Sequence, residues 1–262
     1  MRNLTKQLAV TSLLLSSTLT FAQTDEEKGQ RLAQLADKIN SGWVDQTVDI
    51  TMTLQNKAGE KNIRKVRNEA LEVEGDGDKS IVVFDTPYDV KGTVMLSFSH
   101  KVGDDDQWLY LPALKRVKRI SSSNKSGPFM GSDFAYEDMS SQEVEKYTYR
   151  FIREDKFKGQ AVNVVERIPV YDNSGYSKQL VWLDEKRTIP LQIEYFDRKG
   201  SALKTQHFKG YKLHNQRFWR VDDLTMINHQ KGTQTTISFE NYSINQGVRL
   251  TNFAQANLSR IR

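Results

Sequence analysis

Histidines are the side chains of this sequence with the widest chemical range, but their spacing gives no catalytic or metal site. The four are scattered along the chain, at His100, His207, His214 and His229. No HExxH pair is present, although such a pair on one helix face is a usual zinc-binding arrangement. His207 and His214 could lie on neighbouring strands, yet solvated histidines at strand ends are much commoner than metal ligands. We therefore expect no metal.

Three consecutive carboxylates, Asp104, Asp105 and Asp106, form a second candidate group. A calcium loop of the EF-hand type needs spaced oxygen ligands and a terminal Glu, and this run has neither. We interpret it as a solvated hairpin turn. The GxSxG elbow of acyl hydrolases and the GxxxxGK(S/T) phosphate loop are also absent from the sequence. The sequence therefore predicts a protein that is not an enzyme and has no cofactor.

A basic group follows the carboxylates, close to Trp108. Its members are Lys115, Arg116, Lys118 and Arg119. Basic residues near aromatic ones suit nucleic acid, but the whole chain has a mixed charge, with 38 Lys and Arg against 33 Asp and Glu. We expect no nucleic acid and propose contact with phospholipid headgroups or with an acidic patch on a membrane partner. The alternative is a solvated basic strand.

The N-terminus has the parts of a secretory signal peptide. Arg2 and Lys6 precede an apolar run over residues 8–19, and Ala22 precedes an acidic segment. The run is short for a bilayer span and contains several Ser and Thr residues, which disfavours the alternative of a retained anchor. We expect residues 1–22 to be removed, so that the mature chain begins near Gln23 in the periplasm.

The rest of the chain predicts one domain, residues 23–262, that is mainly β with a few helices. The apolar spacing over Asp25–Asn40 predicts an amphipathic helix. After it, apolar and polar residues alternate in segments separated by turn residues, which is typical of antiparallel strands with one solvated face. A sheet of that size must close on itself or be covered.

One face of these strands supplies a candidate lipid-binding surface. The apolar residues assigned to it are Val94, Leu96, Phe98, Ile193, Tyr195, Leu224 and Met226. An apolar inner face is usually a filled core. However, the sequence predicts only one long helix and one short flap to cover many strands, which favours a cavity.

The runs WLYLPALKRVKRIS and FMGSDFAYEDM resemble the outer membrane lipoprotein-sorting proteins, a family of LolA- and LolB-like periplasmic lipoprotein carriers. The resemblance implies an incomplete, half-open antiparallel β-barrel covered by short helices, and non-covalent carriage of acyl chains. The sequence has no Cys, so it cannot carry the acylated N-terminal Cys of a membrane-fixed receptor, and a shuttling member is implied. The family's carrier holds its lid closed with an arginine on an early strand, a position that Arg64 or Arg67 could occupy.

Residues 129–139 are expected to form a movable lid over the cavity. Glycines and a proline around the segment allow it to hinge. The apolar lid residues are Phe129, Met130, Phe134 and Tyr136. We expect its carboxylates, Asp133, Glu137 and Asp138, to face outward and to pair weakly with the basic group at 115–119.

These observations predict a periplasmic carrier that binds acyl chains of lipoproteins or lipids and shuttles them between the envelope membranes. The alternative is an accessory binding module that docks to an export transporter of the RND/MMPL type and carries no lipid. The expected partners are acyl chains, an inner-membrane transporter of that type and an outer-membrane acceptor. We expect the protein to be a monomer.

Overall fold

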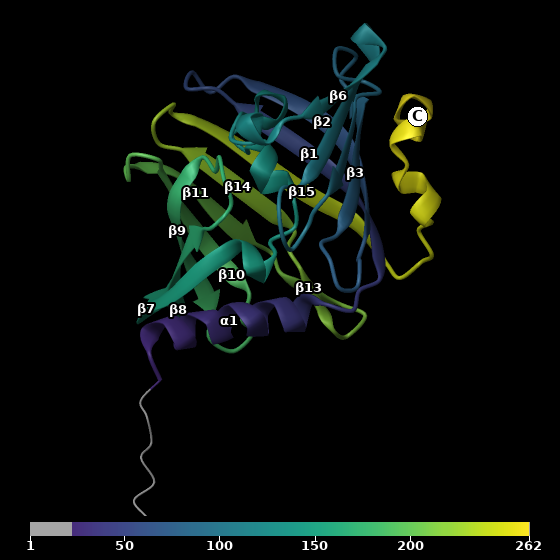
Figure 1. Cartoon of the computed structure of the whole chain (residues 1–262). Coiled ribbons are helices and arrows are strands. Elements are labelled where there is room, and N and C mark those ends of the chain that lie inside the picture. The colour runs from purple at the N-terminus through teal and green to yellow at the C-terminus, as the bar shows by residue number, and fades with distance from the viewer. Residues whose placement is uncertain (1–22, 262) are drawn as a thin grey trace, which may run out of the picture.

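One long sheet organises the computed structural model, which describes residues 23–261 (Figure 1). The predicted signal peptide, residues 1–22, lies outside the described residues. The α-helix and the strands are α1 (Asp25–Asn40), β1 (Asp45–Gln55), β2 (Lys61–Leu71), β3 (Lys79–Thr86), β4 (Val94–Phe98), β5 (Asp106–Leu111), β6 (Arg116–Ile120), β7 (Tyr147–Phe157), β8 (Gln160–Pro169), β9 (Tyr176–Asp184), β10 (Pro190–Asp197), β11 (Ala202–Lys209), β12 (Lys212–His214), β13 (Phe218–Arg220), β14 (Asp223–Asn228) and β15 (Thr233–Ile244).

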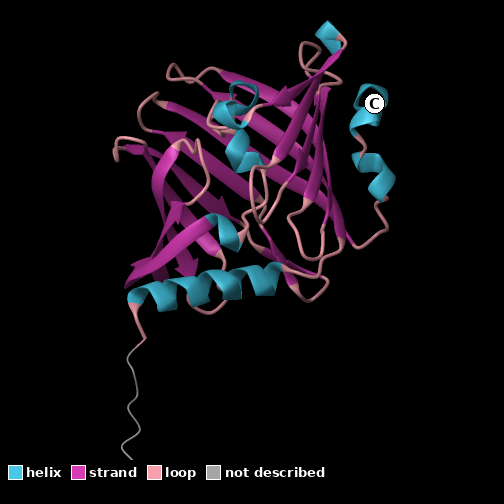
Figure 2. Cartoon of the chain, viewed as in Figure 1, coloured by secondary structure: helices cyan, strands magenta, loops and turns pink. Residues whose placement is uncertain are grey.

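Short 3-10 helices complete the described chain. They are η1 (Pro112–Leu114), η2 (Ser122–Asn124), η3 (Phe129–Gly131), η4 (Tyr136–Met139), η5 (Val144–Lys146), η6 (Leu250–Phe253) and η7 (Gln255–Arg260). Figure 2 shows these helical segments around and in front of one large layer of strands.

The sheet has thirteen strands in the order β6-β5-β4-β3-β2-β1-β15-β14-β11-β10-β9-β8-β7. Its two edge strands, β6 and β7, do not pair, so the sheet stays open. They follow each other in the sequence, and the residues between them, 121–146, therefore pass from one edge to the other. This arrangement confirms the mainly β fold and the half-open antiparallel barrel.

Alternation along the strands separates the two faces of the sheet. Met52 on β1 pairs with Ile237 on β15, and both belong to the main apolar cluster on the concave face. On β9, Val181 joins that cluster, while its neighbour Trp182 belongs to a separate one. The period-2 pattern of the sequence thus becomes an inner and an outer face.

Helix α1 lies across one end of the sheet, near β7 (Figure 1). Thr24 caps it with a capping box, as expected for a helix that begins at Asp25. Gly29 packs so closely on β7 that an added Cβ would lie 2.7 Å from Phe151 N, so a side chain there would push the helix away. None of the helices in residues 23–261 combines the length and hydrophobicity needed to span a bilayer.

The C-terminal cover, residues 248–261, packs on the convex face of β3 and β4 (Figure 1). Its Phe253 and Leu258 are 3% and 0% exposed and contact residues of both strands in one apolar cluster. At this end, the sheet is therefore covered on both faces.

Candidate functional site

A cavity of about 1180 Å³ lies between the concave face of the sheet, α1 and the lid, residues 129–139. Small-molecule sites usually occupy roughly 300–1,000 Å³, so this cavity can hold a large ligand. Its apolar lining comes from strands far apart in the sequence and includes Ile50, Met52, Val66, Val82, Val165, Val181, Leu183, Ile189, Ile193, Phe208, Leu224, Ile237 and Phe239. The arrangement suits burial of flexible apolar chains rather than polar chemistry.

Three of the predicted lipid-binding residues line this cavity: Ile193, Tyr195 and Leu224. Met226 lies in the same apolar cluster, but it is 0% exposed and does not line the cavity. The structure therefore places Met226 in the packed layer beside the cavity. That position indicates a role in supporting the wall.

Val94, Leu96 and Phe98 do not line the cavity, which contradicts their predicted position. They lie on the convex face, with Leu96 opposite Ile81 of β3, in the cluster covered by the C-terminal segment. Their neighbour Met95 is the β4 residue in the concave cluster. The physical reason is that β4 is apolar on consecutive positions and is buried on both faces, so alternation cannot identify the inner one.

The lid covers the cavity with aromatic side chains. Phe129 and Phe134 are 0% and 3% exposed and line the cavity. The Phe129 ring lies 5.9 Å from that of Phe84 and 5.7 Å from that of Tyr136. Met130 and Tyr136 pack against the same cluster. The structure thus brings all four predicted lid residues together.

The lid carboxylates face inward, so the expected outer latch to the basic group is wrong. Asp138 Oδ2 lies 2.7 Å from Lys204 Nζ of β11, and Lys204 is 3% exposed. Asp133 accepts a hydrogen bond from Thr235 on β15 at 2.8 Å. Burial makes partners for these carboxylates necessary, and Asp133 and Asp138 find them on the strands beneath the lid. Sequence reasoning missed Lys204, which no local motif marks.

Glu137 is the third buried lid carboxylate. Its oxygens accept hydrogen bonds from Tyr171 Oη at 3.0 Å, Ser174 Oγ at 2.8 Å and Gly175 N at 2.8 Å. Burial first, and then the charge of Asp138, raise the pKa of Glu137 above its usual value, although these hydrogen bonds oppose the shift. An added Cβ at Gly175 would lie 2.8 Å from Glu137 Oε1, so a side chain there would displace this carboxylate.

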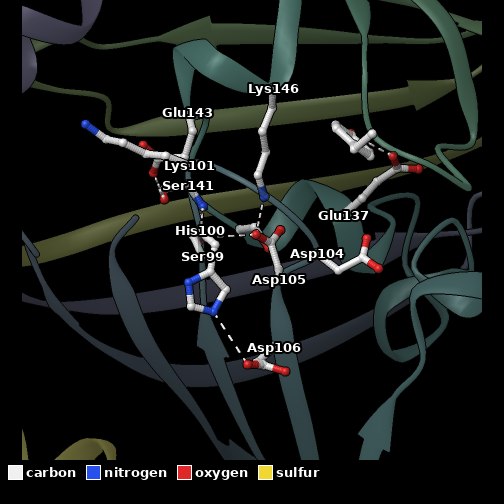
Figure 3. Close-up of polar contacts among 12 residues, drawn as sticks. Ser99, His100, Lys101, Asp104, Asp105, Asp106, Glu137, Ser141, Glu143 and Lys146 are labelled. Atoms are coloured by element: carbon white, nitrogen blue, oxygen red, sulfur yellow. Dashed lines mark hydrogen bonds and ion pairs between the residues drawn. The ribbon is translucent and has the colours of Figure 1, made fainter. Parts of the chain in front are cut away.

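Asp104 and Asp105 anchor the two ends of the segment that carries the lid. Asp104 pairs with Lys125 at 3.0 Å, ahead of the lid. Asp105 pairs with Lys146, after the lid (Figure 3). Lys125 and Lys146 are only 8% and 7% exposed. The solvated turn expected for this acidic run is therefore incorrect for Asp105, whose side chain is 15% exposed, whereas that of Asp104 is 48% exposed. The turn between β4 and β5 is thus bonded to the chain both before and after the lid.

Asp106 has different partners, on the outer side of the same turn. It pairs with Arg119 of β6. Its other oxygen lies 3.5 Å from His100 Nε2 (Figure 3). His100 Nδ1 lies 2.8 Å from Asp76. The hydrogen bond to Asp76 is the main cause that raises the pKa of His100. These residues connect neighbouring turns, and Asp76 among them also lines the cavity.

Arg64, and not Arg67, reaches the lid. Arg64 Nη1 donates a hydrogen bond to the Met130 carbonyl oxygen at 2.7 Å. Arg67 instead forms two hydrogen bonds with Asp85, at 2.8 and 2.9 Å. The two arginines of β2 therefore have different roles, which the sequence did not distinguish.

The predicted basic contact residues lie on or beside the edge strand β6. Lys115, Arg116, Lys118 and Arg119 are all exposed, and Arg119 pairs with Asp106. They do not pair with the lid carboxylates in this structure. The group thus forms an open basic surface at one edge of the sheet.

The cavity reaches the surface between the end of α1 and the β2–β3 turn, where its lining includes the exposed Val44 and Glu74. This opening, the acidic rim, also contains Asp37, Asp78 and Glu143. Burial first, and then neighbouring carboxylates, raise the pKa of Asp78 to about 7. Burial is also the main cause that raises the pKa of Asp37 and Glu143. Burial thus makes ionisation of these three carboxylates unfavourable, while Lys101, which also lines the cavity, opposes the shift at Asp37 and Glu143.

The described histidines do not assemble into a metal site. Residues 23–261 contain no group of three or more His, Cys, Asp or Glu side chains with metal-binding geometry. His207 lies on β11, whose partners are β10 and β14, whereas His214 lies on β12, whose partner is β13. The two histidines are therefore not on paired strands.

Comparisons with known proteins give relatives with the same architecture. A family model described as that of an uncharacterized protein matches residues 76–260. A Vibrio parahaemolyticus structure described as an outer membrane lipoprotein-sorting protein domain is 50% identical, with a TM-score of 0.88 over 90% of this chain and 100% of that chain. A DUF1329 family protein from Desulfovibrio piger is 28% identical, with a TM-score of 0.86 over 90% and 99% of the two chains.

A more distant structure has the same fold. A LolA superfamily protein from Nitrosomonas europaea is 17% identical, with a TM-score of 0.70 over 87% of this chain and 98% of that chain. The comparison with curated proteins finds no match.

Proposed function

The chain belongs to the family of outer membrane lipoprotein-sorting proteins, and on this premise we propose that it is a periplasmic carrier of acyl chains. It binds the chains of a lipoprotein or a lipid in its cavity and shuttles them between the envelope membranes. The carriage is non-covalent and needs no cofactor.

The observation that carries this proposal is the apolar cavity of about 1180 Å³ under a lid of buried aromatic residues. Burial of apolar surface contributes about 25 cal/mol per Å². At this coefficient, covering a few hundred Å² of acyl chain stabilises the complex by roughly several kcal/mol. Binding by burial alone is sufficient for capture, and it is reversible at a membrane or an acceptor.

Arg64 supports a closing role for the lid. Its hydrogen bond to the Met130 carbonyl joins the sheet to the lid by one side chain. Because the acceptor is a backbone atom, the bond depends on the position of the lid backbone and not on the side chain at position 130. Acyl chains that displace Phe129 or Phe134 would shift Met130 and break this bond.

The basic group at Lys115, Arg116, Lys118 and Arg119 supplies the surface for delivery. Its exposed side chains suit the anionic headgroups of a membrane or an acidic patch on a partner.

We propose that the protein works as a monomer after removal of residues 1–22, and that it delivers cargo to an outer-membrane acceptor.

A cavity-filling variant tests the proposal. Leu224 lines the cavity, so Leu224→Trp places a bulky side chain where the acyl chain would lie. The matched control is Ile168→Trp on β8, at a position that is 43% exposed and outside the cavity lining. We expect native mass spectrometry of the purified protein to find co-purifying lipid in the wild type and the control, and at least tenfold less in Leu224→Trp.

The same measurement distinguishes the alternative function. An accessory module that docks to an inner-membrane transporter of the RND/MMPL type would purify without lipid as the wild type, as Leu224→Trp and as Ile168→Trp. In a separate binding assay, these three proteins would bind the transporter equally well. That result would overturn the carrier proposal.

A further inference from the structure

A second, smaller pocket of about 300 Å³ lies beside the cavity. It is formed by the turns between β7 and β8, β9 and β10, and β11 and β12, which the antiparallel register brings to the same end of the sheet. The pocket is lined by Phe157, Lys158, Gln160, Arg187, Leu191, Phe208, Lys209, Gly210 and Tyr211. We refer to it as the basic pocket, because its charged lining residues are all cations.

Arg187 is held in place at this pocket. Its Nη2 lies 3.0 Å from Asp184 Oδ2, and its guanidinium carbon lies 5.2 Å from the centre of the Trp219 ring. The side chain is therefore pre-positioned at modest entropic cost, and a planar guanidinium suits oxyanions with several oxygens. Asp184 is the carboxylate nearest to this arrangement and neutralises one of the three cations.

Lys158 and Lys209 complete the positive charge. Within residues 23–261, neither ammonium group has a carboxylate within ion-pair distance, and Lys158 Nζ lies 5.2 Å from the centre of the Phe157 ring. Their charge affects a neighbour: burial first, and then Lys158 and Lys209, lower the pKa of His207. A positive potential thus exists here that no described side chain compensates fully.

The basic pocket and the large cavity share two wall residues, Phe208 and Tyr211. Their rings are stacked, with centroids 6.4 Å apart and an angle of 12° between the planes. Tyr211 Oη donates a hydrogen bond to the Pro190 carbonyl at 2.8 Å, which fixes this pair against β10. The stacked pair is therefore a wall common to the apolar cavity and the basic pocket, so the two spaces are adjacent.

The other opening of the cavity has a mixed charge. The acidic rim contains Asp37, Asp78 and Glu143, with Lys101 also in the lining, and burial is the main cause that makes ionisation of these carboxylates unfavourable. The rim thus mixes both signs of charge, whereas the charged lining residues of the basic pocket are all cations. A phosphate group therefore finds more favourable charge at the basic pocket than at the rim.

We propose that the basic pocket binds a phosphate group and that, in the loaded carrier, this group belongs to the headgroup of an anionic lipid whose acyl chains occupy the cavity. Arg187, Lys158 and Lys209 contact the phosphate, and the Phe208–Tyr211 pair lies against the glycerol region. This inference rests on the proposed carrier function and adds the class of cargo to it.

The test compares lipids that share acyl chains and differ in headgroup. Diacylglycerol, phosphatidylcholine and phosphatidylglycerol are offered to the full protein from vesicles, and bound lipid is quantified by native mass spectrometry. We expect the wild type to prefer phosphatidylglycerol, and Lys158→Glu with Lys209→Glu to reduce its binding at least tenfold while diacylglycerol binding is unchanged. The charge-matched control is Lys57→Glu with Lys199→Glu, at exposed turns outside the pocket.

The outcomes separate the two proposals. Equal binding of all three lipids, unaffected by Lys158→Glu with Lys209→Glu, would overturn the headgroup site and leave the carrier intact. Binding of inorganic phosphate that the variant abolishes, without any preference among lipids, would assign the pocket to free phosphate and would also overturn it. Failure of the wild type to bind any lipid would instead contradict the carrier function.

Discussion

The lid and the C-terminal cover are both short segments rich in 3-10 turns, yet they cover the sheet in different ways. The C-terminal cover packs directly on β3 and β4 through Phe253 and Leu258. The lid also packs apolar side chains, Phe129 and Phe134, into the main cluster, but it lies over the cavity and adds polar bonds to its buried carboxylates and from Arg64. Both segments are thus packed on the core, and the lid in addition closes a cavity and is joined to the sheet by buried polar bonds.

The difference explains which segment can move. Apolar packing is lost atom by atom when a cover lifts, and water must then solvate both surfaces. Polar bonds can be exchanged for bonds with water or with a partner when both groups become solvated, and hydrogen bonds to charged groups contribute about 1.5–3 kcal/mol each. A lid joined by such bonds can open over a cavity without disrupting the sheet.

The largest effect is expected from Lys204→Met. This change leaves Asp138 and the Asp133 carbonyl without their buried cation, and breaking one partner of a buried pair typically costs about 3–5 kcal/mol. Opening of the lid relieves that cost. We expect amide hydrogens in residues 129–139 to exchange much faster, while those in residues 250–260 keep the wild-type rates.

Lys199→Met is the control for this experiment, because Lys199 is exposed and lies at a turn. Equal acceleration in the lid and in the C-terminal cover of Lys204→Met would mean that the two covers unfold together, and the contrast between them would be wrong.

Leu258→Ala should have the next largest effect, and on the other cover. Leu258 is 0% exposed in the convex cluster, so its truncation should lower the free energy of unfolding by about 2–5 kcal/mol. Lipid retention should be unchanged, because the residue lies on the face opposite the cavity. Urea unfolding measures the first quantity and native mass spectrometry the second. The matched control, Leu250→Ala, removes a side chain that is 59% exposed, and it should change stability by less than about 0.5 kcal/mol.

The smallest effect concerns pH. The pKa of Glu137 is raised in the folded protein, mainly by burial, from an ordinary value of 4.5. Its contribution to stability is therefore fully present below that ordinary value and is lost as the pH rises through the folded pKa. We expect lid amides to become less protected between pH 4.5 and neutrality, after correction for the intrinsic pH dependence of exchange, and Glu137→Gln to reduce this change.

The C-terminal cover is the internal reference for the pH experiment. Its titratable side chains are Arg249 and Arg260, which stay charged throughout this range. Protection that changes with pH to the same extent in both covers would show that Glu137 is not the cause.

The sequence by itself determined the local elements and the architecture. The spacing over Asp25–Asn40 specified α1, and turn residues between alternating segments specified the antiparallel strands, because both signals are contained within a few neighbouring residues. The resemblance of the stretch around Trp108 and Phe134 correctly indicated the half-open barrel. Alternation placed Ile193, Tyr195 and Leu224 on one apolar face of the strands, and the cavity itself was expected from the few covering helices and from the resemblance.

Only the tertiary structure decided which face of β4 is inner and which way the lid carboxylates point. Val94, Met95 and Leu96 are consecutive apolar residues, so period-2 alternation could not choose between the faces; Leu258, more than a hundred residues away in the sequence, covers the outer one. Asp138 likewise depends on Lys204, a partner on a distant strand. Partners of buried groups are set by packing between remote segments, and neighbouring residues in the chain carry no signal of that choice.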